Sequence, residues 1–340
     1  MSSAIVPSAQ PEQILKGLSK LWTSLAREEK QQGQPTVLRA CAMTLIVACD
    51  DSDGGASASQ TIAELMHEHP SRGIVLAISP GEPVAPEARV LAQFWKPFGK
   101  AQQIGCEQIE IKASPETWPD IGPILFGLTA ADLPVIFWCR HQAALSADAT
   151  ADQQRGLQTI MDLASKTIID TRGLNPAQSF PLLVKWRNKG YVVADLEWTR
   201  LTRWREPLGH IFDNTARPNP FSSFHTIEIG HPGERPGAAE FYMAGWLSAP
   251  CRARVVFKHE PGFGPGIHSV TLRSTSETLT FARTGEECLK IQSTNGRQRG
   301  FSYSDPTVTS LMTEELSITG VDPVFDVAFT RARELMSEYR

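Results

Sequence analysis

The sequence predicts an α/β protein: an N-terminal open, mostly parallel, Rossmann-like sheet with helices on both faces, followed by an α+β domain with an antiparallel sheet. Apolar runs typical of strands buried on both faces alternate with helical patterns through the first part of the chain. Short runs of alternating polarity, separated by turn residues, fill the last third. The 340 residues exceed one ordinary core of roughly 100 to 200 residues, so two domains are expected.

An amphipathic helix is expected before the first strand. Apolar residues recur there at steps of three and four, which places them on one helical face: Ile14, Leu15, Leu18, Leu21, Trp22 and Leu25. The polar stretch from Glu28 to Pro35 has the composition of a tether, so residues 1–35 are predicted to form a helix and a linker. This helix can pack on its own domain, which is the commoner fate, or be presented to a partner.

The first domain is predicted to span residues 36–217. Six apolar runs indicate its strands: Met43–Cys49, Gly73–Ser79, Glu107–Lys112, Pro134–Trp138, Thr167–Asp170 and Tyr191–Asp195. The intervening segments can each supply a crossover helix: Ser59–His67, Pro86–Phe98, Pro115–Leu128, Gln153–Ala164 and Gln178–Asn188. Strands joined by such crossovers lie parallel in one sheet.

The second domain is predicted to span residues 218–340, because Asn, Pro, Ser and Gly cluster near its start. Short alternating runs predict an antiparallel meander: Cys251–His259, Ile267–Ser274, Glu277–Ala282, Cys288–Gln292 and Gln298–Ser304. Helical spacing is found in three segments: Gly237–Leu247, Thr307–Ile318 and Pro323–Tyr339. Strands and helices in this arrangement predict an α+β domain.

The charge balance and the cysteines limit the classes of partner and the compartment. A net charge of −4 lacks the clustered basic excess that binds nucleic acid, so no nucleic-acid partner is expected. The longest apolar stretches fall far short of the ~20 residues that cross a bilayer, and the first residues do not resemble a secretory signal. Six cysteines without CxxC spacing are interpreted as reduced structural thiols. We therefore expect a cytoplasmic protein without a membrane partner.

A search for chemistry finds no familiar motif. The turn after the first strand begins with Asp50 and contains neither GxGxxG nor GxxxxGK[ST], and its carboxylates would repel a phosphate. The spacing of an EF-hand, a GxSxG elbow and an HExxH pair are also missing from the sequence. The sequence therefore predicts a protein that is not an enzyme and that carries no catalytic, cofactor or metal site.

The segment from Asp195 to Leu208 is unusual because it is rich in tryptophan and arginine. It contains Trp198, Arg200, Arg203, Trp204 and Arg205 within eight positions. Such side chains dominate the hot spots of protein interfaces, and arginines also bind anions. The alternative is a capped helix whose tryptophans fill the core while its arginines pair with neighbouring carboxylates. The sequence leaves both interpretations open.

Five segments in a fixed order resemble the glucose-6-phosphate dehydrogenase assembly protein OpcA family. They are RACAMTLIV at 39–47, HPSR at 69–72, DLPVIFW at 132–138, IIDTR at 168–172 and DLEWTRLTRWRE at 195–206. The resemblance covers approximately Arg39–Phe212, and it is looser in the second domain, where AGWL at 244–247 carries it. The chain departs from the family pattern at Glu197, where Asn is commoner, and at Cys139, where a second Trp is common.

This resemblance implies a non-catalytic partner of glucose-6-phosphate dehydrogenase that promotes the active oligomer in the oxidative pentose phosphate pathway. An allosteric activator of this kind binds one state of the enzyme more tightly and so shifts the population toward it. The side chains predicted to contact the enzyme are Trp198, Arg200, Trp204 and Arg205, with the helix face of Leu18, Leu21 and Trp22 as a second candidate.

The competing hypothesis is an enzyme or sensor that binds a sugar phosphate or a nucleotide at the carboxyl ends of the parallel strands. Ligands of open α/β sheets bind at that edge. Its predicted anion-binding residues are His69, Arg72 and Arg172.

Overall fold

The computed structural model describes residues 2–6, 9–31, 37–50, 55–79, 87–97, 103–130, 132–146, 148–212, 223–251, 253–262, 264–285, 287–296 and 298–339. The chain folds into two compact units, residues 1–169 with 185–193 and residues 170–184 with 194–340. The predicted boundary at 217/218, most of the acidic turn after Asp50 and the end of the predicted linker lie outside the described residues. The domain limits given above therefore stay predictions.

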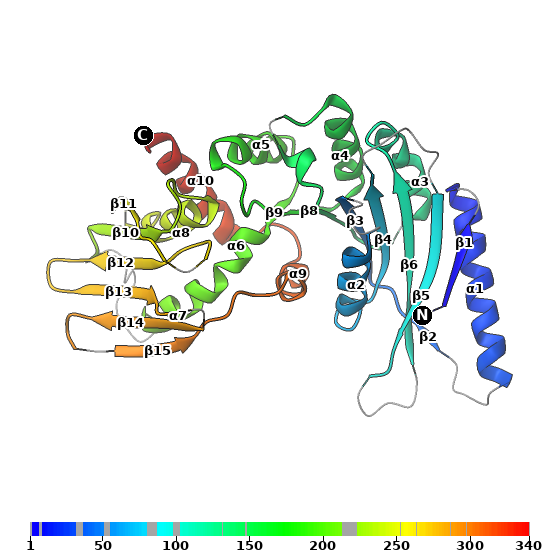
Figure 1. The fold of residues 1–340 in the computed structure, drawn as a ribbon, viewed down its shortest axis with the longest axis horizontal. Helices are drawn as coiled ribbons and strands as arrows, with labels where there is room; N and C mark the ends of the chain where they lie inside the picture. Colours follow the sequence, from blue (N-terminus) through cyan, green and yellow to red (C-terminus); the bar gives the residue numbers. More distant parts are fainter. Residues whose placement is uncertain are drawn as a thin grey trace. The chain divides into compact units, whose positions relative to one another are not determined.

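A nine-stranded sheet dominates the first unit, in the order β1-β5-β6-β4-β3-β7-β8-β9 with β2 beside β6 (Figure 1). Its strands are β1 (Ser2–Val6), β2 (Leu38–Arg39), β3 (Met43–Asp50), β4 (Ser71–Ile78), β5 (Glu87–Trp95), β6 (Ile104–Ala113), β7 (Val135–Cys139), β8 (Lys166–Ile169) and β9 (Val193–Asp195). The pairs from β6 to β8 are parallel, whereas β5 is antiparallel to both of its neighbours. The six predicted strands and the mostly parallel sheet are confirmed.

The helix expected over Pro86–Phe98 is wrong, because this segment forms strand β5. Glu87 and Arg89 are exposed while Ala88 and Val90 are buried, which is the period of two that a strand requires, and the next three residues are all buried. The strand pairs with β6 on one edge and with β1 on the other, so its backbone hydrogen bonds are satisfied. The apolar residues were too dense for this alternation to stand out in the sequence.

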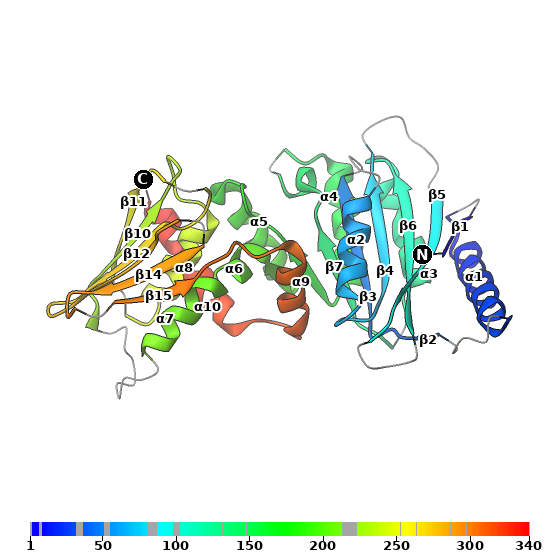
Figure 2. The same ribbon diagram turned by 60° about the horizontal axis from the view of Figure 1, so that its bottom comes forward.

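Helices cover both faces of this sheet, as expected (Figures 1 and 2). They are α1 (Pro11–Gln31), α2 (Ala56–Leu65), α3 (Gly122–Leu128) and α4 (Ala151–Leu163), with short turns of 3-10 helix at Trp118–Ile121 and Gln142–Leu145. On β6, Glu107 accepts a hydrogen bond from Trp22 of α1, whereas Glu110 accepts one from Ser59 of α2. Side chains three positions apart on a strand point to opposite faces, so α1 and α2 cover opposite faces.

The second unit contains a six-stranded sheet in the order β11-β10-β12-β13-β14-β15. Its strands are β10 (Thr226–His231), β11 (Arg254–His259), β12 (Ser269–Arg273), β13 (Thr278–Arg283), β14 (Cys288–Ser293) and β15 (Gln298–Ser302). The meander from β12 to β15 is antiparallel, as predicted. The sequence missed β10, and β11 pairs with it in parallel rather than joining the meander. Helix α8 (Ala238–Ser248) connects these two parallel strands, as a crossover must.

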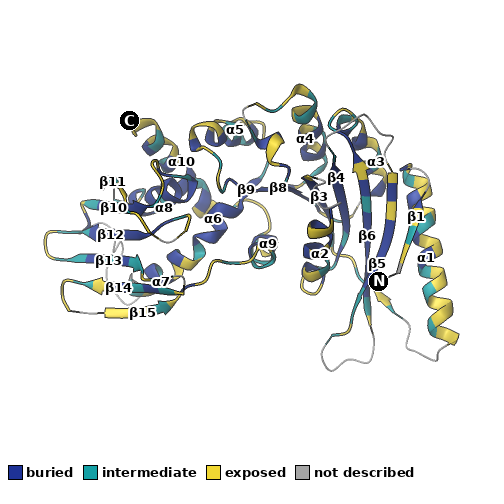
Figure 3. Cartoon of the chain, viewed as in Figure 1, coloured by how far each residue is buried: buried dark blue, intermediate teal, exposed yellow. Residues whose placement is uncertain are grey.

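Further helices of the chain are α5 (Pro176–Asn188), α6 (Leu196–Arg200), α7 (Thr202–Phe212), α9 (Val308–Ser317) and α10 (Pro323–Glu338). The core of the second unit is aromatic and includes Phe180, Tyr242 and Phe325, all buried. Helix α8, which carries Tyr242, is buried over most of its length (Figure 3). Helices α8 and α10 approach closely at Gly245, where an added β-carbon would lie 2.2 Å from the carbonyl oxygen of Ala328. Glycine is required there by this close approach.

Two further observations concern the described residues. None of the described helices is long and apolar enough to cross a membrane. The six cysteines are free thiols, and burial raises the pKa of Cys106 and of Cys139 to about 12. A thiol with such a raised pKa is inert, as expected of a structural cysteine, whereas Cys41 is exposed and its structural role stays a prediction.

Candidate functional site: the Asp195 to Arg205 segment

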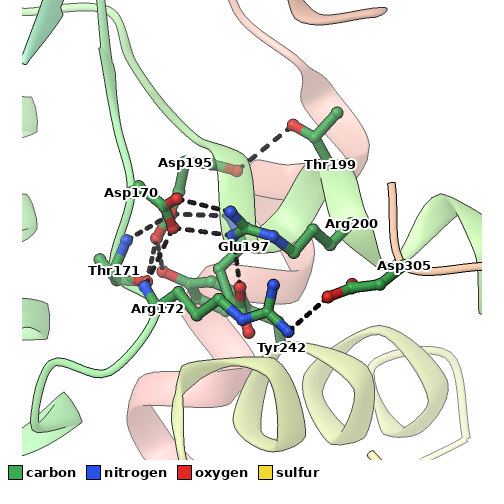
Figure 4. A network of polar contacts seen from close by, with 9 residues as sticks. All are labelled: Asp170, Thr171, Arg172, Asp195, Glu197, Thr199, Arg200, Tyr242 and Asp305. Carbon is green, nitrogen blue, oxygen red and sulfur yellow. Dashed lines mark hydrogen bonds and ion pairs between the residues drawn. The ribbon is translucent and has the colours of Figure 1, made fainter. Parts of the chain in front are cut away.

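Arg200 lies at the centre of an ion-pair network in the second unit (Figure 4). Its guanidinium donates to both carboxylate oxygens of Asp170, at 2.8 and 2.5 Å, and to Glu197 at 2.6 Å. The first contact is the two-pronged geometry in which arginine binds carboxylates most strongly. Only 9% of the Arg200 side chain is exposed, so two carboxylates already occupy the group that was expected to contact a partner.

Asp195 lies beside this network and connects helix α6, helix α8 and the residues that follow β8. Its carboxylate accepts hydrogen bonds from the Thr171 hydroxyl at 2.6 Å and from the Tyr242 hydroxyl of α8 at 2.7 Å. It also accepts the backbone N–H of Glu197 at 3.0 Å and so caps helix α6. Asp195 is fully buried, and these donors are what makes its burial tolerable. The carboxylate therefore fixes where α6 begins.

Burial changes the acidity of two carboxyl groups of this network, Asp195 and Glu197. Desolvation raises the pKa of Asp195 to about 6, although Thr171 and Tyr242 donate hydrogen bonds that oppose the shift. Desolvation raises the pKa of Glu197 to about 7, although the Arg200 guanidinium lowers it. Glu197 is 6% exposed. The network thus holds a carboxyl group that titrates near neutral pH.

The two tryptophans of the segment are part of the core. Trp198 is 2% exposed, stacks on Phe325 with the ring centroids 5.4 Å apart, and donates its indole N–H to Asp322 at 2.8 Å. The Arg205 guanidinium lies over the same indole, 3.9 Å from its centroid. Trp204 is also 2% exposed and meets Tyr303 edge to face, with the centroids 6.0 Å apart. The structure agrees with the capped-helix interpretation, and direct contact of these side chains with a partner stays a prediction.

The second group of predicted contacts lies on α1. Leu18 and Leu21 are buried, because α1 packs on β1 and β5 of its own unit. Trp22 is half-buried, donates its indole N–H to Glu107 at 2.9 Å, and meets Phe94 edge to face. Of the two alternatives for this helix, the structure shows the first, in which the helix packs on its own domain.

The three predicted anion-binding residues do not share one edge of the sheet. His69 and Arg72 lie at the amino end of β4, which begins at Ser71, so their placement at the carboxyl ends is wrong. Arg72 donates to Glu107 at 2.9 Å and to the Leu128 carbonyl at 2.6 Å. Arg172 follows β8 in the second unit and donates to Asp305 at 2.9 Å. His69 precedes β4 and Arg72 is its second residue, so both lie at the end of the strand opposite to the one that the competing hypothesis requires.

The sequence did not indicate the contacts of this network. Tyr242 lies in a hydrophobic helix without a motif. Asp170 and Thr171 belong to the IIDTR segment of the family resemblance, but Asp170 was predicted inside the strand that ends at Ile169. Asp195 did carry a signal, since an aspartate immediately before a helical pattern is a common cap. Within the described residues, no group of three or more His, Cys, Asp or Glu side chains has the geometry of a metal site.

Two family models match the chain in order. Residues 62–183 match the model described as the glucose-6-phosphate dehydrogenase subunit N-terminal domain, and residues 191–329 match the model described as its C-terminal domain. Both models carry the family name OpcA, and together they cover more than half of the chain. The chain belongs to the OpcA family. This membership confirms the resemblance that the sequence motifs indicated.

Curated members of the OpcA family align with part of the chain. A putative OxPP cycle protein OpcA from Synechocystis sp. is 26% identical over 214 residues, which are 61% of this chain and 42% of that protein. The protein of the same name from Nostoc punctiforme is 27% identical over 199 residues, which are 57% of this chain and 40% of that protein. The chain thus spans about two fifths of the length of the curated relatives it matches.

Solved structures resemble the chain only distantly. The UDP-N-acetylglucosamine 3-dehydrogenase GnnA from Acidithiobacillus ferrooxidans aligns over 86% of this chain and 96% of its own, with a TM-score of 0.41 and 8% identity. An oxidoreductase from Sinorhizobium meliloti aligns over 90% and 91%, with a TM-score of 0.41 and 11% identity. A likeness at this level carries no statement about activity.

Proposed function

We propose that the chain is a non-catalytic assembly factor that binds glucose-6-phosphate dehydrogenase and promotes its active oligomer in the oxidative pentose phosphate pathway. The observation that carries this proposal is the ordered match of the chain to the N-terminal and C-terminal domain models of a glucose-6-phosphate dehydrogenase subunit. The names of the curated relatives, which are OxPP cycle proteins, support the same pathway.

Activation in this proposal is a shift of population. A protein that binds one conformer or oligomer of the dehydrogenase more tightly than the others raises the population of that form. A preference of about 1.4 kcal/mol changes the ratio of two forms about tenfold. The chain needs a binding surface for this role and no catalytic group.

Because Trp198 and Trp204 are buried, their replacement is a poor test of binding to the dehydrogenase. Replacing a buried tryptophan by alanine costs about 3–5 kcal/mol of folding free energy, so a loss of activation would not separate binding from unfolding. Exposed side chains are better probes. Arg203 is exposed on α7, and Val324 and Val327 are 45% and 59% exposed one turn apart on α10. Exposed apolar side chains at this spacing suit a partner interface.

The experiment follows NADPH formation by the cognate dehydrogenase at fixed concentration as the chain is added. We expect a saturable rise in rate, weakened by Arg203→Glu or Val327→Asp through a higher half-saturating concentration. Arg299→Glu is the matched control, since Arg299 is exposed on β15 and its replacement reverses the same charge. An unchanged rate at saturating concentrations of the folded chain would contradict the proposal. Equal activation by all three variants would show that Arg203 of α7 and Val327 of α10 do not contact the dehydrogenase.

A further inference from the structure

A cavity of about 580 Å³ in the first unit lies between α1 and the residues beside the amino ends of β4 and β6. Its walls combine apolar side chains of α1 with the charged groups of Arg27, Lys30, Arg39, Arg72 and Glu107. Cavities of roughly 300–1,000 Å³ are the size that small organic ligands occupy.

The cavity has an excess of positive charge. Glu107 is 8% exposed and already accepts hydrogen bonds from Trp22 and Arg39 on one oxygen and from Arg72 on the other. One carboxylate therefore neutralises only one of two guanidinium groups. Arg27 and Lys30 are exposed at the rim and, within the described part of the chain, form no ion pair. The four cations and one carboxylate leave the cavity with a positive charge in a protein whose net charge is −4.

The arginines are held in place before any ligand arrives. Arg72 is fixed by Glu107 and by the Leu128 carbonyl. Arg39 lies over the indole of Trp22, 4.9 Å from its centroid, and 56% of its side chain remains exposed. A guanidinium fixed by stacking loses little entropy when it binds an oxyanion, and its planar fork suits phosphate oxygens. The site is thus prepared for an anion with several oxygens.

The cavity also offers an apolar surface. Trp22 and Leu15 are partly exposed, and both line the same cavity as the cations. Inorganic phosphate gains nothing from such a surface, whereas the carbon skeleton of an organic phosphate can pack against it.

We propose that this cavity is a binding site for a small organic phosphate, with Arg27, Lys30, Arg39 and Arg72 binding the phosphate group and Trp22 contacting the organic body. The site is separate from the Asp195 to Arg205 segment and lies at the amino ends of the strands rather than at the carboxyl ends. It goes beyond the proposed function, because it concerns the isolated chain and requires no dehydrogenase.

The test is calorimetric titration of the isolated chain with glucose 6-phosphate, glucose and inorganic phosphate. We expect saturable binding of glucose 6-phosphate, weaker binding of inorganic phosphate and no binding of glucose. The double variant Arg27→Gln/Lys30→Gln should weaken glucose 6-phosphate binding by about tenfold or more, since each charge-assisted hydrogen bond contributes substantially. Added salt should weaken binding in the wild-type chain.

The matched control is Lys16→Gln/Lys20→Gln, which removes the same charge from the same helix but lines a different groove. All four lysine and arginine side chains are exposed, so circular dichroism should show an intact fold in both double variants. Three results would each overturn the proposal: no saturable binding of glucose 6-phosphate at millimolar concentration, equal weakening by the control variant, or equal affinity for inorganic phosphate and glucose 6-phosphate.

Discussion

At the scale of single residues, Arg200 connects two carboxylates that would otherwise repel each other. Asp170 and Glu197 both lie within 2.8 Å of its guanidinium nitrogens. Glu197 is buried, and the Arg200 guanidinium lowers its pKa, so without this guanidinium the group has lost both water and its counter-charge and must take up a proton or remain an unpaired carboxylate. The stability of the second unit should therefore depend strongly on this one side chain.

We predict that Arg200→Met lowers the free energy of unfolding by about 3–5 kcal/mol at neutral pH, as removal of one member of a buried ion pair does. Urea unfolding followed by tryptophan fluorescence measures the loss. Arg299→Met is the control, since Arg299 is exposed on β15 and its replacement should change stability by less than about 0.5 kcal/mol. A loss no greater than that of the control would show that the network does not stabilise the fold.

Glu197 should make stability depend on pH. Its pKa rises from 4.5 in the unfolded chain to about 7 in the folded protein, so the folded state holds the proton more tightly. The stabilisation from this group is therefore fully present below pH 4.5 and is lost as the pH rises through about 7. Glu197→Gln mimics the protonated form, and its stability relative to wild type should increase by roughly 3 kcal/mol across that window.

Unfolding free energies of Glu197→Gln and wild type, measured at matched pH values through this window, test the prediction. The difference between the two proteins isolates Glu197, because Asp195, whose pKa is also raised, titrates in both. A difference that stays constant with pH would contradict the raised pKa of Glu197.

At the scale of helices and strands, the packing of α8 on α10 depends on Gly245. An added methyl group would collide with the backbone of Ala328, which cannot move without shifting α10. We predict that Gly245→Ala destabilises the protein by about 1–3 kcal/mol or more, as overpacking does. Gly209→Ala on α7 is the control: among the described residues, no atom outside its own helix backbone and chain neighbours lies within 4 Å of the added β-carbon, and the better helix former should be neutral or stabilising. Thermal unfolding distinguishes the two, and equal melting temperatures would contradict the close approach.

The elements also show what the sequence could predict. The strands β3, β4 and β7 are short continuous apolar runs, which is the strongest signal for a strand buried on both faces. Strand β5 was mistaken for a helix, because its dense apolar residues fit either period. Strand β10 follows residues rich in turn formers and was not recognised before the meander. The pattern of apolar residues does not show which neighbouring strand a segment pairs with, and this pairing is what stabilises strands such as β5 and β10.

The sequence indicated which segment forms the candidate site, but it did not indicate which residues that segment contacts. The tryptophans and arginines between Asp195 and Arg205 stood out in the sequence. The hydrogen bond of Asp195 to Tyr242 joins residues 47 positions apart, and that between Thr199 and Glu315 joins residues 116 positions apart. Contacts of this range are decided by tertiary packing, so the choice between an exposed anchor and a core residue needed the structure.

At the scale of the whole molecule, membership of the OpcA family and the ordered match of both domain models are the observations behind the proposal that the chain binds glucose-6-phosphate dehydrogenase. Two kinds of residue differ in their expected role. The network around Arg200 is expected to maintain the fold, whereas exposed groups of α7 and α10 are expected to contact the enzyme. Variants of the two kinds should therefore differ: the first lowers stability, and the second lowers affinity in a chain that remains folded.

The most direct test of the proposed assembly role is the mass distribution of the dehydrogenase, measured at a concentration low enough for its oligomer to dissociate, with and without the chain. We predict that the chain enters a heavier complex and that the fraction of assembled dehydrogenase rises saturably as the chain is added. An unchanged mass distribution in the presence of an excess of the folded chain would contradict the proposal.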